Sequence, residues 1–108
     1  MEESSVFMIK LKSWNYSIWK SRMQDLLYMK DLHEPIKGDE AKLTDLNDKK
    51  WTQLNQKTIS TIRSWIDQSV YHHVAKESKT DVLWRKLETI YEQPATQNRV
   101  NMMKMLLT

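Results

Sequence analysis

Residues 15–27 read NYSIWKSRMQDLL, and the spacing of the apolar letters predicts an amphipathic helix. These apolar residues recur at steps of three and four, which places them on one helical face: Tyr16, Trp19, Met23, Leu26 and Leu27. Asn15 precedes this face, and its side-chain oxygen is suited to accept hydrogen bonds from the first-turn amides. We therefore expect a helix over 16–32, with Leu11 in a strand-like arm that packs back on the domain.

The same type of pattern returns along the rest of the chain. Further helices are expected over 46–66, 70–74, 81–92 and 96–107. Thr44 or Asp45 is predicted to cap the first of these, and Thr80 is predicted to cap the helix over 81–92. Residues 33–42 read as a loop, because they contain a proline and because Gly38 tolerates a positive φ.

The composition excludes several classes of function. The 108 residues suit one domain, and they include no cysteine and a single glycine. Without cysteine there is no disulfide, no thiolate catalysis and no zinc site that needs thiolates. Phosphate-binding loops, dinucleotide fingerprints and hydrolase elbows all require more glycine. We expect an all-α domain, a small bundle of four to five helices, that is not an enzyme and holds no cofactor or metal.

The aromatic residues suggest both a core and a contact surface. We expect the large side chains on the apolar faces to form the structural core: Tyr16, Trp19, Met23, Trp51, Ile62, Trp65, Trp84, Leu87 and Tyr91. Trp14 lies outside the stripe of the first helix, between polar residues. The last helix carries methionines on more than one side, which is typical of a helix with a second partner. The candidate interaction surface is therefore Trp14, Met102, Met103 and Met105.

The charge is only weakly basic. The sequence contains seventeen Lys and Arg and fourteen Asp and Glu, which gives a net charge of +3. One of the densest cationic regions comprises Lys10, Lys12, Lys20 and Arg22, and it contains no run of like charges, so we expect weak or indirect contact with RNA. His72 and His73 are adjacent, and neighbouring helical side chains diverge by about 100°, so they do not suggest a metal site. No apolar stretch predicts a membrane span, and we expect a cytoplasmic protein.

Two motifs resemble the Gag proteins of copia-type retrotransposons. Residues 11–23, LKSWNYSIWKSRM, resemble the family's opening motif, in which Leu and a few polar residues precede Asn-Tyr, Trp-Lys and a Met. Residues 82–91, VLWRKLETIY, are similar to a later helix of the family, with Trp, Leu and Tyr at the same spacing. The resemblance extends over 11–107. It departs from the family at Ser13, where Gly is common, and at 80–81, where the family has Ala.

The resemblance implies a structural capsid protein. Gag proteins of this family assemble into virus-like particles that enclose element RNA, and the N-terminal half of the capsid is helical. The chain would then be a single capsid N-terminal domain over 1–108, like that of retroviral capsids. Residues 1–10 would form a flexible arm, and the chain would be truncated before a C-terminal capsid domain. The family's Cys-Cys-His-Cys knuckle is absent, since this sequence has no cysteine.

Three functions remain compatible with the sequence, and one of them, direct binding of RNA or DNA by this domain, is supported only by weak cationic clusters and available aromatic residues. In the first, the domain associates with copies of itself and with a C-terminal capsid domain, and RNA binds to the full-length protein. In the alternative, a domesticated Gag-derived adaptor uses the same surfaces to bind a host protein or peptide. Contacts between identical chains and contacts with a foreign partner use the same residue types, so the sequence does not separate them.

Overall fold

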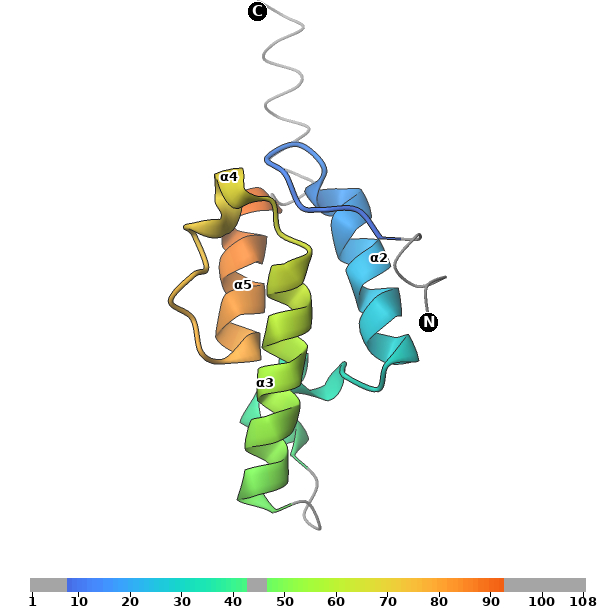
Figure 1. Cartoon of the computed structure of the whole chain (residues 1–108), viewed down its shortest axis with the longest axis vertical. Helices are drawn as coiled ribbons and strands as arrows, with labels where there is room; N and C mark the ends of the chain where they lie inside the picture. The colour runs from blue at the N-terminus through green and yellow to red at the C-terminus, as the bar shows by residue number, and fades with distance from the viewer. Residues whose placement is uncertain (1–7, 43–46, 93–108) are drawn as a thin grey trace, which may run out of the picture.

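The structure, a computed structural model, describes residues 8–42 and 47–92 (Figure 1). These residues form four α-helices and two short 3-10 turns: α2 (Tyr16–Met29), η1 (Glu34–Lys37), η2 (Asp39–Ala41), α3 (Asp48–Ser64), α4 (Gln68–Tyr71) and α5 (Thr80–Tyr91). No β-sheet occurs among them, and the all-α expectation is confirmed. The helix expected over 96–107 lies outside the described residues, as do Thr44 and Asp45.

In the view of Figure 1 the long helix α3 lies in front, between the outlines of α2 and α5. The helices α2 and α5 also contact each other directly, through Trp19 and Trp84, and η1 packs against both α3 and α5. The apolar faces of the three helices meet in one cluster, joined by side chains from the arm and from the segment after α3. Its buried members are Met8, Leu11, Tyr16, Trp19, Met23, Leu26, Leu27, Leu32, Ile59, Ile62, Ile66, Val70, Val74, Leu83, Trp84 and Leu87. Among the described residues, no helix is long and apolar enough to cross a membrane.

The first helix ends earlier than its apolar pattern suggests. Two backbone bonds close its end, from the Asp31 amide to the Tyr28 carbonyl (3.1 Å) and from the Leu32 amide to the Leu27 carbonyl (2.7 Å). Asp31 has a φ of +57°, and this combination is the Schellman termination. The chain then turns through η1 and η2, where a simple loop was expected. Gly38 between them has a φ of +87°, as expected of a glycine there.

The helix starts also differ from the sequence prediction. Asn47 caps α3, and its Oδ1 accepts from the Lys50 amide at 2.8 Å. The helix α4 begins two residues before the expected position, after Asp67. Thr80 is the first residue of α5 and does not cap it, because its hydroxyl donates to Oδ1 of Asn55 at 2.8 Å. Its amide donates to the same oxygen at 2.9 Å, so a side chain from α3 replaces the local cap.

The N-terminal arm is part of the packed domain from Met8 onward. Met8 is buried, Ile9 packs against the core, and Leu11 is fully buried in a parallel bridge with Ile66. The expected packing of Leu11 is confirmed. The flexible arm expected over 1–10 is corrected for residues 8–10, because the neighbouring side chains of Met8 and Ile9 anchor them to the core. Residues 1–7 lie outside the described part of the chain.

Candidate interaction surface

The arm is held across the end of α3 by backbone hydrogen bonds. The Leu11 amide donates to the Trp65 carbonyl at 2.7 Å, and the Asp67 amide donates to the Leu11 carbonyl at 2.9 Å. The indole Nε1 of Trp19, on α2, donates to the same Trp65 carbonyl at 2.9 Å. One peptide group therefore joins the arm, α2 and the end of α3 in a fixed arrangement.

The turn that follows the arm is braced by Asn15. Its Oδ1 accepts from the Lys12 amide at 2.7 Å, and its Nδ2 donates to the Lys10 carbonyl at 2.9 Å. Asn15 occupies the N-cap position of α2, but its side chain makes no capping bond, which corrects the expected role. Because both ends of the turn are anchored, Trp14 at its tip is held away from the core, with 78% of its surface exposed.

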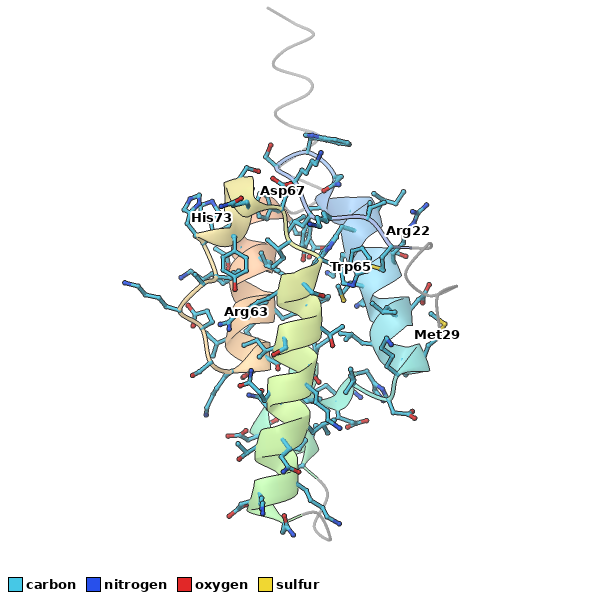
Figure 2. The ribbon with its side chains drawn as sticks, in the orientation of Figure 1. Arg22, Met29, Arg63, Trp65, Asp67 and His73 are labelled. Carbon is cyan, nitrogen blue, oxygen red and sulfur yellow. The ribbon has the colours of Figure 1, made fainter. Side chains whose placement is uncertain are left out.

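An open groove of about 610 Å³ runs between the arm and the start of α2. It is lined by Ile9, Lys10, Lys12, Trp14, Asn15, Ile18, Arg22 and Asp67. Figure 2 shows Asp67 beside the arm at the end of α3 and Arg22 on α2. We call this feature the arm groove. Its described lining residues combine one exposed indole and apolar side chains with three cations and one carboxylate.

The carboxylate in the arm groove is engaged with its own helix. Asp67 Oδ2 accepts from the Ser69 hydroxyl at 2.6 Å and from the Ser69 amide at 3.0 Å, and so caps α4. These bonds lower the pKa of Asp67, and the nearby charges of Lys12 and Lys10 lower it further. Ser69 therefore fixes the position of this carboxylate beside the lysines, which remain exposed to solvent.

Lys20 belongs to a different surface, although the sequence groups it with the arm cations. Its ammonium bonds Glu92 at 2.7 Å and Glu88 at 3.2 Å, which ties α2 to α5. Desolvation of the ammonium opposes its protonation, but the bonds to Glu92 and Glu88 outweigh it and raise the pKa of Lys20. Only Lys10, Lys12 and Arg22 of the predicted cationic cluster line the arm groove.

Beside this ion pair, two tyrosine rings stack at the joint of α2 and α5. The centroids of Tyr16 and Tyr91 lie 5.8 Å apart, and both hydroxyls are buried without a hydrogen-bond partner among the described residues. Burial raises the pKa of Tyr16, and the charges of Glu92 and Glu88 raise it further. Burial also raises the pKa of Tyr91. Both rings therefore act as neutral packing groups and not as acids or bases near neutral pH.

The structure places most of the predicted core residues in the core. Buried there are Tyr16, Trp19, Met23, Ile62, Trp84 and Leu87, and the partly buried Trp65 and Tyr91 pack against them. Trp51 is the exception, since it lies outside the cluster near the start of α3. Its indole Nε1 donates to Asp39 Oδ1 at 3.0 Å, and it lines a polar pocket with Asn55 and Lys79. This part of α3 extends past the ends of α2 and α5 (Figure 1), and among the described residues Trp51 there meets η2 and the loop before α5.

Of the candidate interaction residues, the structure describes one and leaves three outside the described part of the chain. Trp14 is exposed in the arm groove, whereas Met102, Met103 and Met105 lie outside the described residues. Other exposed large apolar side chains lie on α2: Ile18, Tyr28 and Met29. These three residues were not singled out from the sequence. An apolar helical pattern identifies the buried face of a helix, but it does not show which residues on the outer face form a contact.

The histidine pair does not behave as expected from an uninterrupted helix. The rings of His72 and His73 do not diverge, and their centroids are 4.0 Å apart, because the pair stands at the end of α4. In the described part of the chain, no three His, Cys, Asp or Glu side chains are grouped so that they could hold a metal.

Comparisons with known proteins agree on one family. A family model described as the gag-polypeptide of LTR copia-type matches residues 23–108. A retrovirus-related Pol polyprotein from transposon TNT 1-94 of Nicotiana tabacum is 28% identical over 91 residues, which is 84% of this chain. The chain spans 7% of the length of that polyprotein. No solved structure matches.

Proposed function

The chain belongs to the gag-polypeptide family of LTR copia-type elements, and from this premise we propose that it is a structural capsid domain that associates with its own copies. In the full-length protein it contributes to virus-like particles that package element RNA, next to a C-terminal capsid domain. The proposal assigns the domain no catalytic step, and it places assembly in the cytoplasm. The observation that carries it is the family match over residues 23–108.

The outer face of α2 supports a role in assembly. Tyr28 and Met29 lie at its C-terminal end with 60% and 59% of their surfaces exposed, and neither belongs to the core. Figure 2 shows Met29 at the edge of the molecule, far along α2 from Arg22 and the arm groove. Exposed apolar side chains that are neighbours on the surface are typical of contacts between proteins. We assign this end of α2, the α2 tip, to the contact between copies.

Light scattering coupled to size exclusion, over a wide range of protein concentration, tests this assignment. We expect a reversible dimer or larger oligomer, and electron microscopy of the chain with added RNA should show particles. Met29→Lys should weaken association about tenfold or more, because it places a charge in an apolar contact. Val82→Lys is the matched control, since Val82 is an exposed apolar residue on α5.

A chain that stays monomeric at every concentration, with and without RNA, contradicts self-association by this domain. That result favours the adaptor alternative, in which the same exposed side chains contact a host protein. Equal weakening by the substitutions at Met29 and Val82 would also contradict the assignment of the contact to the α2 tip.

A further inference from the structure

The arm groove presents its cations and its indole on one side of a rigid segment. In an extended chain, side chains at alternate positions point to the same face. Leu11 is fully buried and points into the core, so Lys10 and Lys12 point outward, and both are exposed. The turn that follows holds Trp14 over the same groove. A flat aromatic surface and two ammonium groups are therefore available together.

The electrostatic balance of the arm groove favours an anionic ligand. Among the described residues that line it, Lys10, Lys12 and Arg22 are cationic, and Asp67 carries the one carboxylate. That carboxylate is held by both hydrogen-bond donors of Ser69, at 2.6 and 3.0 Å, and caps α4. The positive end of the α2 dipole lies beside the groove as well, at Asn15, and the first turn of α2 contains no acidic residue to offset it.

We propose that the arm groove binds single-stranded nucleic acid, with one base stacked on Trp14 and the adjoining phosphates on Lys10 and Lys12. Proteins that bind single strands combine a cationic groove with aromatic side chains on which bases stack. Paired bases are already stacked on each other in a duplex, so an isolated indole at the tip of a turn suits an unpaired base. The indole is exposed without any rearrangement of the core, so the surface is formed before a ligand arrives.

This inference deepens the proposed function, because it names a place where RNA touches the capsid domain itself. It replaces the weak or indirect contact expected from the net charge, since three of the positive charges are gathered in one groove. The two proposals use different surfaces, the arm groove for RNA and the α2 tip for association. Variants at Trp14 and Met29 therefore test them separately.

Fluorescence anisotropy of a labelled oligouridine of about twelve nucleotides tests the arm groove, with the 108-residue chain as titrant. Trp14→Ala should weaken binding about fivefold or more, the effect of one lost base–aromatic stack, while Trp14→Phe should retain most of the affinity. Lys12→Gln should lower the slope of log affinity against log salt by about 0.7, the contribution of one phosphate contact on a single strand.

Matched variants outside the groove serve as controls. Val82→Ala removes an exposed apolar side chain from α5, and Lys49→Gln removes an exposed cation from α3. Both should bind as the unchanged protein does, and circular dichroism should show intact helices in every variant. Wild-type affinity in Trp14→Ala and Lys12→Gln, or equal losses in the controls, would overturn the proposal. Loss of self-association in Trp14→Ala with unchanged RNA affinity would overturn it too, in favour of a second copy of the chain as the occupant.

Discussion

Trp14 and Trp19 stand five positions apart in the chain and have opposite surroundings. Trp19 is fully buried, and the centroid of its ring lies 5.9 Å from that of Trp84. Its Nε1 donates to the Trp65 carbonyl. Trp14 is exposed, and its surroundings are cationic side chains and solvent. The difference follows from the arm, which pulls Leu11 inward and leaves the turn after it outside. At the residue scale, the two rings thus serve stability and recognition respectively.

Trp84 provides the first prediction at this scale. Trp84 is buried, with 4% of its surface exposed, and its ring packs against that of Trp19. Trp84→Ala should reduce the free energy of unfolding by about 3–5 kcal/mol, because the cavity it leaves cannot close fully. Urea denaturation followed by circular dichroism measures this loss. Trp14→Ala, at an exposed site, should change it by less than about 0.5 kcal/mol; comparable losses in the two variants would contradict the core described here.

At the scale of elements, the helices follow from local periodicity, but the starts of α2 and α5 depend on side-chain bonds that lie outside those helices. The apolar periodicity predicts α2, α3 and α5 to within a few residues, since each has one continuous buried face. Their starts are less predictable, because the polar side chains involved have partners from elsewhere. Asn15 braces the arm, and Thr80 bonds to Asn55 on α3, so neither caps its helix. A local sequence pattern holds no information about such partners.

The bonds of Asn55 lead to a second prediction. Its Oδ1 accepts from the amide and hydroxyl of Thr80, and its Nδ2 donates to the Ser78 carbonyl at 2.9 Å. Asn55→Ala leaves the buried Thr80 without these acceptors and should cost about 1–3 kcal/mol of unfolding free energy. Chemical denaturation measures the change. The neighbouring Gln56→Ala, on the exposed side of α3, should stay within about 0.5 kcal/mol, and an equal effect of both would refute this role.

The cap of α4 gives a prediction that depends on pH. The pKa of Asp67 is lowered in the folded protein by its bonds to Ser69, so it lies below the value in the unfolded chain. The ionised carboxylate therefore stabilises the fold fully above about pH 4, and this contribution disappears as the pH falls through the lowered pKa. Asp67→Ala should lower the melting temperature near neutral pH, and the gap should close in acid. Thermal melts across this range measure it, and a gap independent of pH would contradict the cap.

At the scale of the whole molecule, the arm covers one end of the helical bundle, where it bonds to the segment that follows α3. It crosses the end of α3, and its Leu11 joins Ile66 in the parallel bridge that the structure describes. The sequence suggests an arm that packs back, because Leu11 is apolar among polar neighbours, but not the place where it packs. That place depends on the path of the chain after α3, which no periodicity encodes. Trp51 is missed for the same reason. The apolar periodicity of α3 predicts that it is buried, but α3 extends there past the ends of α2 and α5, and Trp51 bonds to Asp39 instead (Figure 1).

Leu11 supplies the prediction at this scale. Leu11→Ala removes a fully buried side chain where the arm, α2 and the segment after α3 meet. It should cost about 2–5 kcal/mol of unfolding free energy, and it should also loosen the arm groove. Denaturation with urea gives the loss of stability. Ile18→Ala, half exposed in the groove, should cost less than about 0.5 kcal/mol, and an unchanged stability of Leu11→Ala would show that the arm is not part of the folded unit.

The hydrogen bonds to the Trp65 carbonyl also determine how fast certain protons exchange with solvent. This carbonyl accepts both the Leu11 amide proton and the indole proton of Trp19, and the Asp67 amide is bound to the same stretch of arm. A proton held in this way exchanges with deuterium only when its bond opens. Separation of the arm from the end of α3 releases the Leu11 and Asp67 protons in a single event. Their common exchange rate therefore measures how often this end of the bundle opens, and slower exchange of the indole proton would show that α2 stays in place when it does.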